Sequence, residues 1–248
     1  MNPNAVLNDF NQPKLLNLQG NLADNLKDAR QHHSDRFNPY ELNGGNCVGI
    51  VQDNVAVIAA DTRLSRGFSI LKRDATKIHR LNEDTYILSA GAYADVINLW
   101  RVLDQRIELF ELNHGEQMSS SAIASLLSRV LYERRFFPYY TFNIVVGFAD
   151  NGEAMLWNYD AVGNYERRGH TASGNANDMI EPLLDNQLDG YNSVVKPKKK
   201  HTDELVELAV DAFQSAAERD ITCGDAVEVF VLQKGQVQLH KHFPLRHD

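Results

Sequence analysis

Residues 43–63 read NGGNCVGIVQDNVAVIAADTR, and the rest of the chain is organised around this stretch. Two short apolar runs, 47–51 and 55–60, flank the polar residues 52–54, which is the pattern of a β-hairpin. The second run is almost wholly apolar, as expected of a strand that is buried on both faces. A polar triplet that begins at Asp61 follows it, so we expect a core strand to stop there.

Lys77 follows Asp61 after one polar loop, and the whole arrangement resembles the β-type subunits of the proteasome core particle, a family of N-terminal-nucleophile hydrolases. In active members a propeptide is removed after a glycine, and the freed N-terminal threonine opens a strand. An aspartate ends the next strand, and a lysine comes one loop later. By that spacing, the place of the nucleophile falls on Gly45 and that of the lysine on Lys77. Alone, Asp61 and Lys77 would be taken for an exposed pair beside a turn, and Asp220 further along favours the resemblance.

The resemblance also implies which residues stand in the hydrolase site. The corresponding positions are Gly45, Asp61, Lys77, Asn175, Asp220 and Cys223. The aspartates and the lysine match the family, whereas Asn175 and Cys223 stand where active members have serine. Gly45 has no side chain and therefore no hydroxyl that could attack a carbonyl. Gly91 matches the glycine of the family's oxyanion hole, although a glycine that merely precedes a helix is the simpler interpretation. We expect a vestigial site, with no catalytic residue, no cofactor and no metal.

Cys47 is the rival nucleophile, because cleavage after Asn46 would expose it as an N-terminal cysteine. It lies two residues beyond the required place, so its side chain faces the correct side but is displaced by about 7 Å. A small apolar residue inside a strand is the favoured interpretation of this cysteine. A serine uncovered by processing, and a free-standing hydrolase that forms no ring, are further alternatives.

Composition indicates a soluble globular protein inside the cell. The chain has 248 residues, 43% of them hydrophobic, which is enough for a sizeable core. The net charge of -8 argues against a nucleic-acid partner. Two cysteines build no disulfide framework, which suits a reducing compartment. No apolar run is long enough to span a bilayer, and the first 34 residues lack the core of a signal peptide.

The N-terminal residues 1–35 are rich in Asn, Gln, Asp and Leu, and we interpret them as a pro-segment or flexible arm. His32 and His33 fit a solvated pair better than a metal site, because no further ligands accompany them. Residues 36–248 are expected to form a single domain.

Periodicity predicts the remaining elements. Further strand pairs are expected at 78–81 with 85–90, at 141–148 with 153–159, and at 226–232 with 237–242, with a shorter strand at 165–167. Helices are expected at 92–112, from a cap at Ser119 or Ser120 to about 137, at 178–184 with a break at Pro182, and from a cap at Thr202 or Asp203 onward. Strands grouped in antiparallel pairs argue against a parallel doubly wound sheet. They favour an α+β fold with two packed sheets and a helix pair on each outer face. The resemblance likewise implies a four-layer αββα sandwich.

Several longer segments, among them 37–45, 134–140 and 215–220, resemble one particular non-catalytic member of the family. This resemblance covers nearly all of 36–248 and departs at Asn46, where threonine is usual. It implies a structural subunit that partners other α and β subunits in stacked seven-membered rings around a chamber through which polypeptide substrates pass. It further implies a place in the cytoplasm and nucleus, with no membrane or nucleic-acid partner.

Overall fold

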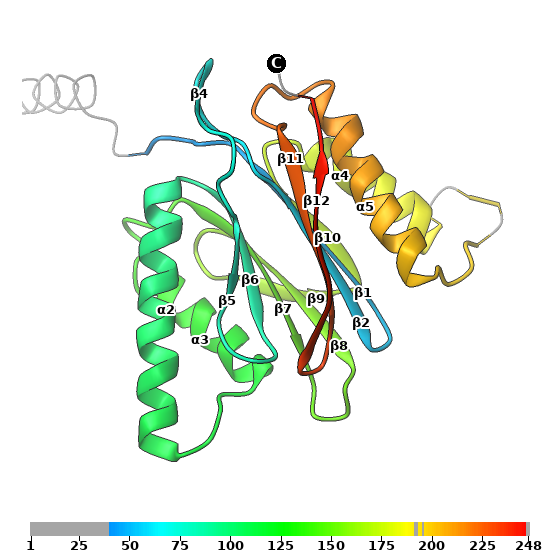
Figure 1. Ribbon diagram of the computed structural model, residues 1–248. Helices are drawn as coiled ribbons and strands as arrows, with labels where there is room; N and C mark the ends of the chain where they lie inside the picture. The colour runs from blue at the N-terminus through cyan, green and yellow to red at the C-terminus, as the bar shows by residue number, and fades with distance from the viewer. Residues whose placement is uncertain (1–39, 191–192, 195, 247–248) are drawn as a thin grey trace, which may run out of the picture. The chain divides into compact units, whose positions relative to one another are not determined.

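The computed structural model describes residues 40–190, 193–194 and 196–246. The expected arm at 1–35, with His32 and His33, lies outside the described residues. The residues from Glu41 onward group into one structural unit. The fold within that unit is α+β, with two five-stranded antiparallel sheets and helices beside each of them (Figure 1).

The first sheet is built on the predicted hairpin, which is confirmed. Its strands are β1 (Asn46–Gln52), β2 (Val55–Asp61), β10 (His170–Gly174), β11 (Ala226–Gln233) and β12 (Gln236–Pro244). They lie in the order β10-β1-β2-β11-β12, with every neighbouring pair antiparallel. The two C-terminal strands form the predicted last hairpin. Strand β10 was not anticipated, since its sequence HTASG lacks a strand-like alternation of apolar and polar residues.

The second sheet contains the other predicted strand pairs. Its strands are β5 (Ile78–Arg80), β6 (Tyr86–Gly91), β7 (Thr141–Phe148), β8 (Ala154–Tyr159) and β9 (Tyr165–Arg168), in that order. A separate two-stranded ribbon, β3 (Leu64–Arg66) with β4 (Ser69–Lys72), occupies the stretch that the sequence suggested to be a polar loop. The residues of this ribbon are mostly exposed, which explains why no apolar pattern marked it.

The helices are α2 (Tyr93–His114), α3 (Ser120–Tyr132), α4 (Asn177–Leu184), the π-helical η2 (Asp185–Asp189) and α5 (Thr202–Ala217). Gly115, in the left-handed conformation, caps the C-terminus of α2. The Ser119 hydroxyl caps α3 as predicted, by accepting a hydrogen bond from the Ala122 N–H at 3.3 Å. The helix α3 ends at Tyr132, earlier than the predicted end near residue 137.

Two predictions about the later helices are wrong. Pro182 does not break α4; the helix runs through it and widens directly into η2. Proline removes one backbone donor, but Ile180 and Leu184 on either side of it are buried in the cluster with α5, and such tertiary packing stabilises the helix. The helix α5 begins after His201, one residue earlier than predicted, because the His201 N–H donates to the Glu204 carboxylate at 2.7 Å.

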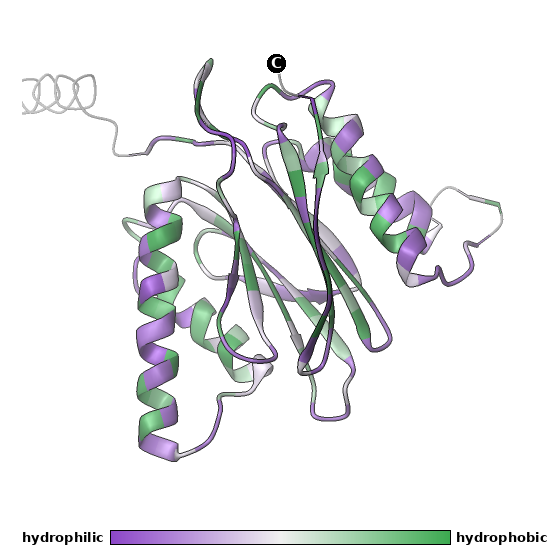
Figure 2. Cartoon of the chain, in the orientation of Figure 1, coloured by the Kyte–Doolittle hydropathy of each residue, from purple (hydrophilic) through white to green (hydrophobic). Residues whose placement is uncertain are grey.

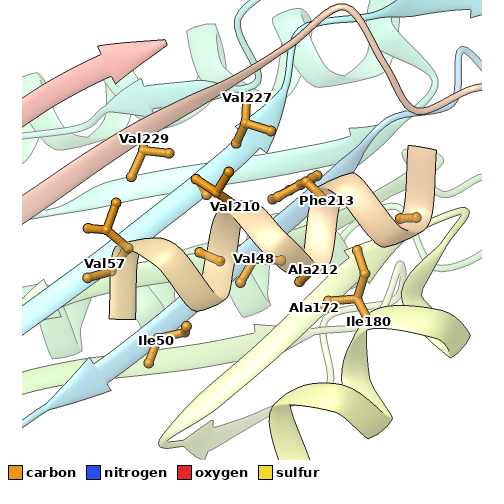
Figure 3. Packing of buried hydrophobic residues seen from close by; sticks show 14 of the residues in the cluster. Val48, Ile50, Val57, Ala172, Ile180, Val210, Ala212, Phe213, Val227 and Val229 are labelled. Carbon is orange, nitrogen blue, oxygen red and sulfur yellow. The ribbon is translucent and has the colours of Figure 1, made fainter. Parts of the chain in front are cut away.

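Three clusters of buried side chains hold the unit together. One joins the first sheet to α4 and α5, and Figure 3 shows Phe213 and Val210 of α5 above Val48 and Val57 of the sheet. A second joins the second sheet to α2 and α3. The third contains side chains of both sheets, including Ile58 of β2. Hydrophobic stretches accordingly run along the strands and the helices in Figure 2.

Strand β2 contributes to two of these clusters. Val57 and Ala59 belong to the helix-facing cluster, whereas Ile58 and Ala60 belong to the cluster that contains side chains of both sheets. The expectation of a strand buried on both faces is therefore confirmed. None of the helices among the described residues is long and apolar enough to cross a membrane.

Candidate functional site

The centre of the candidate site is the buried pair of Lys77 and Asp61, whose side chains are 2% and 0% exposed. Lys77 Nζ donates to the carbonyl oxygens of Asp61 and Arg63, at 2.5 and 2.8 Å, and lies 3.4 Å from Asp61 Oδ2. The other carboxylate oxygen of Asp61 accepts a hydrogen bond from the Asn46 N–H at 2.5 Å. Burial raises the pKa of the Asp61 carboxyl, against the lowering effects of the Lys77 charge and of the Asn46 N–H.

Gly45 lies directly against the Lys77 side chain. Its φ of 91° is a conformation that residues with a side chain rarely adopt. A Cβ atom placed on Gly45 would lie 2.8 Å from Lys77 Cδ and would overlap Cε. The volume that a nucleophilic side chain would need at this position is therefore filled by the lysine.

Asn175 and Asp220 are connected through Thr222. The Thr222 hydroxyl lies 2.8 Å from both Asp220 carboxylate oxygens, and it lies 3.1 Å from Asn175 Nδ2, which donates to it. The Thr222 N–H also donates to Asp220, at 2.9 Å. The Asn175 N–H donates to the Gly45 carbonyl oxygen at 3.3 Å, so this network reaches the position of the nucleophile. Sequence analysis did not identify Thr222; its place between Asp220 and Cys223 was the only available signal.

Cys223 completes the set. It is 1% exposed and packs in the cluster with α5. Burial raises the pKa of its thiol, and the charges of Asp61 and Asp220 add to the effect. The structure thus brings all six sequence-derived positions into one region. In their present form, however, these residues offer no exposed nucleophile next to a base.

Cys47 is also poorly suited to catalysis. Its side chain is 0% exposed and packs in the cluster that contains side chains of both sheets, with Ile58 and Leu88. Burial raises the pKa of the Cys47 thiol, so the protonated, weakly nucleophilic form is favoured.

A cleft of about 330 Å³ adjoins the site and is lined by Gly91, Tyr140, Ser173 and Asn175, among others. Gly91 has a φ of 118°, and a Cβ atom there would overlap the Tyr140 carbonyl oxygen. The Gly91 carbonyl oxygen accepts a hydrogen bond from the Asn43 N–H at 3.2 Å. The positive φ and the close approach of the Tyr140 carbonyl therefore require glycine at position 91.

Two groups of side chains among the described residues have the composition and spacing of metal ligands. They are Glu228 with His240 and His242, and His170 with Asp185 and Asp189. None of these residues belongs to the six positions above.

Comparison with known proteins gives consistent matches. Residues 41–232 match the sequence model of the family described as "Proteasome subunit". Proteasome subunit beta type-1 of Arabidopsis thaliana is 44% identical over 210 residues, which cover 83% of this chain and 93% of that protein. The protein of the same name from Dictyostelium discoideum is 41% identical over 226 residues, covering 90% and 95%. That from Drosophila melanogaster is 41% identical over 219 residues, covering 87% and 92%.

The buried ion pair leads to a prediction about stability. We expect Lys77→Met to destabilise the chain by about 3–5 kcal/mol, because Asp61 is left buried without its cation. The double variant Lys77→Met/Asp61→Asn should recover part of that loss, since the asparagine Oδ1 can still accept from the Asn46 N–H. Resistance to limited proteolysis in extracts of the expressing cells measures the effect.

Lys72→Met is the matched control, because Lys72 is 53% exposed and lies 3.5 Å from the exposed Asp74. Its loss should cost under about 1 kcal/mol. Equal protease resistance of the Lys72 and Lys77 variants would contradict a structural role for the buried pair.

Gly91 leads to a second prediction. Gly91→Ala should sharply reduce the amount of folded chain, because the new methyl group meets a backbone carbonyl that cannot move freely. Gly152→Ala is the control, since Gly152 also has a positive φ, of 84°, but a Cβ atom there has no neighbour within 4 Å. Recovery of soluble chain is the measurement. If the two variants behave alike, positive φ rather than the Tyr140 contact sets the requirement for glycine.

Proposed function

The chain belongs to the family of proteasome subunits, and we propose that it fills one β-type place in the core particle as a structural subunit without hydrolytic activity of its own. The matches to beta type-1 subunits of plants, animals and a slime mould, at 38–44% identity over most of the chain, support a β-type core subunit. Its contribution to ubiquitin-dependent protein degradation is then to help enclose the proteolytic chamber.

One observation carries the proposed lack of activity. Position 45, where active members have threonine, is a glycine whose missing side chain is replaced in space by Lys77. The vestigial positions are then Gly45, Asp61, Lys77, Asn175, Asp220 and Cys223. Asn175 and Cys223 replace the two serines of active members; Asn175 is hydrogen-bonded through Thr222 to Asp220, and Cys223 is buried.

We further infer the four-layer αββα architecture of N-terminal-nucleophile hydrolases. The supporting contacts are the two clusters that join each sheet to its own helices and the third cluster that draws on both sheets. Residues 36–248 would form this one domain, preceded by a removable segment at 1–35.

The similarity favours the sixth position of the β ring, with one ring neighbour on each flank and different residues in the two contacts. Heterologous contacts of this kind, in which two different surfaces of a subunit meet its two neighbours, form a closed ring when the rotation from each subunit to the next closes on itself. The helix pairs would meet an α ring on one side and the second β ring on the other. We propose the cytoplasm and nucleus as the location, and we expect neither a membrane nor a nucleic acid as a partner.

The rival function is that of a peptidase that uses Cys47. Complete burial of that side chain and the raised pKa of its thiol disfavour it. A covalent inhibitor that reacts with N-terminal nucleophiles should therefore label the neighbouring active subunits of the particle and leave this chain unlabelled.

Purification of the tagged chain from its own cells tests the proposed function. We expect it to elute with a complete set of α and β subunits, and intact-particle mass spectrometry should find it in fixed stoichiometry. Covalent labelling by the inhibitor in the same sample then shows whether this chain carries a reactive nucleophile. Recovery of the chain alone, or covalent labelling of Cys47, would contradict the proposal.

The N-terminus leads to a separate prediction. An active subunit removes its own propeptide with its threonine, which Gly45 cannot do because it has no hydroxyl. We expect a neighbouring active subunit to trim the chain upstream, leaving a mature start near Arg36. Intact-mass measurement of the subunit in the assembled particle gives the start directly. A start at Asn46 or Cys47 would instead favour the rival peptidase.

Installing the nucleophile is expected to restore little activity. In Gly45→Thr, with the arm removed after Gly44, the threonine Cβ would compete with Lys77 for space. Misplacement by about 1 Å can cost on the order of 100-fold in rate, and missing proton-transfer partners a further ~100-fold. Asn175→Ser and Cys223→Ser together should help more than either alone, because such groups act as a unit.

Peptide hydrolysis by particles whose native active subunits are inactivated provides the assay. The same particles with Gly45 unchanged give the background. Robust turnover from Gly45→Thr alone would show that the site tolerates the new side chain and needs neither serine.

A further inference from the structure

The last hairpin gathers three potential metal ligands on one of its faces, well away in sequence from the six positions of the hydrolase site. Glu228 of β11 pairs with His242 of β12, and Phe230 pairs with His240. Paired residues of an antiparallel ladder share a face, and residues two apart on one strand do so too. Regular strand geometry therefore places all four side chains together.

The ligand atoms of the three residues converge. Nε2 of His240 lies 2.9 Å from Glu228 Oε1, and Nε2 of His242 lies 4.0 Å from the same oxygen. All three ligand atoms lie within 4.8 Å of one another. In a tetrahedral zinc site with bonds of about 2.0–2.1 Å, neighbouring ligand atoms are roughly 3.3 Å apart. The observed separations lie on either side of that value.

An ordinary hydrogen bond accounts for only part of this arrangement. It explains the contact between His240 and Glu228, but 4.0 Å is too long for a hydrogen bond from His242 to the same oxygen. An ion shared by the three groups would explain why both imidazoles face one carboxylate oxygen.

Neighbouring residues orient two of the three ligands. The Thr76 hydroxyl donates to Glu228 Oε2 at 2.8 Å, which leaves Oε1 facing the histidines. The His240 ring stacks on Phe230, with centroids 4.0 Å apart and planes 10° from parallel. Hydrogen bonds and packing of this kind commonly orient metal ligands.

The site is also accessible. The Glu228 side chain is 9% exposed, whereas those of His240 and His242 are 45% and 54% exposed. An ion can therefore reach the two imidazoles from solvent.

We propose that Glu228, His240 and His242 bind a zinc ion, with water as the fourth ligand. Two imidazoles and one carboxylate with an open position are an established zinc ligand set. The sequence predicted no metal site, because the three ligands are separated in sequence and come together only through the pairing of β11 with β12. The proposal does not depend on the hydrolytic state of the candidate site.

Zinc content of the assembled particle tests the proposal. Particles carrying the wild-type chain, the His240→Ala/His242→Ala variant or the Lys241→Ala control are stripped with a chelator and equilibrated with buffered zinc. Lys241 lies between the two histidines on the opposite face of the strand. We expect the double variant to lose zinc in an amount equimolar with this chain, and the control to match the wild type. Equal zinc in all three would overturn the proposal.

A variant that should weaken zinc binding without removing a ligand, and a crystallographic map of the bound zinc, provide two further tests. Thr76→Val keeps all three ligands but removes the hydrogen bond to Glu228, so zinc affinity should fall by about 10–100-fold. Anomalous scattering at the zinc edge from zinc-soaked wild-type crystals should show a peak between the three side chains. If the double variant fails to assemble, this map decides, and the absence of a peak there overturns the proposal.

Discussion

The burial of Lys77 against Asp61 is the constraint on which the candidate site depends. An ammonium group and a carboxylate withdrawn from water require compensation by charge and hydrogen bonds. Here the ammonium has two carbonyl oxygens and a carboxylate around it, and the carboxylate in turn accepts from the Asn46 N–H at the start of β1. The pair thereby ties the beginning of one strand to the end of its neighbour. It also fills the space beside Gly45, so the glycine and the ion pair depend on each other.

Hydrogen bonding and burial also account for the other residues of the candidate site. Asn175, Thr222 and Asp220 satisfy one another by hydrogen bonds, and the Asn175 backbone reaches Gly45. Cys223 is buried among apolar side chains. Each residue thus has a packing or hydrogen-bonding role that is independent of catalysis. A structural β subunit needs such a framework, since its two sheets must stay packed together whether or not a peptide is cleaved.

The edge of the first sheet contrasts with its centre. Strand β2 is buried on both faces and is nearly all apolar, whereas β12 is largely exposed and carries two histidines and a lysine. Exposed charged and polar residues on an edge strand limit unwanted pairing with other strands. The contacts of Glu228 with Thr76 and His240 connect this edge to the segment just before β5.

The sequence by itself determined the main hairpins, the two long helices and the lack of a hydroxyl at Gly45, because these follow from local periodicity and from residue chemistry. The tertiary structure alone decided the rest. Strand β10 exists because it pairs with β1, where Gly174 lies opposite Asn46, and its own residues carry no strand pattern. The continuation of α4 through Pro182 is supported by the packing of Ile180 and Leu184 in the cluster with α5 and the first sheet. The bridging role of Thr222 depends on Asn175, 47 positions away in the sequence. The filling of the space at Gly45 by Lys77 is likewise a matter of packing between residues 32 positions apart, which no local pattern encodes.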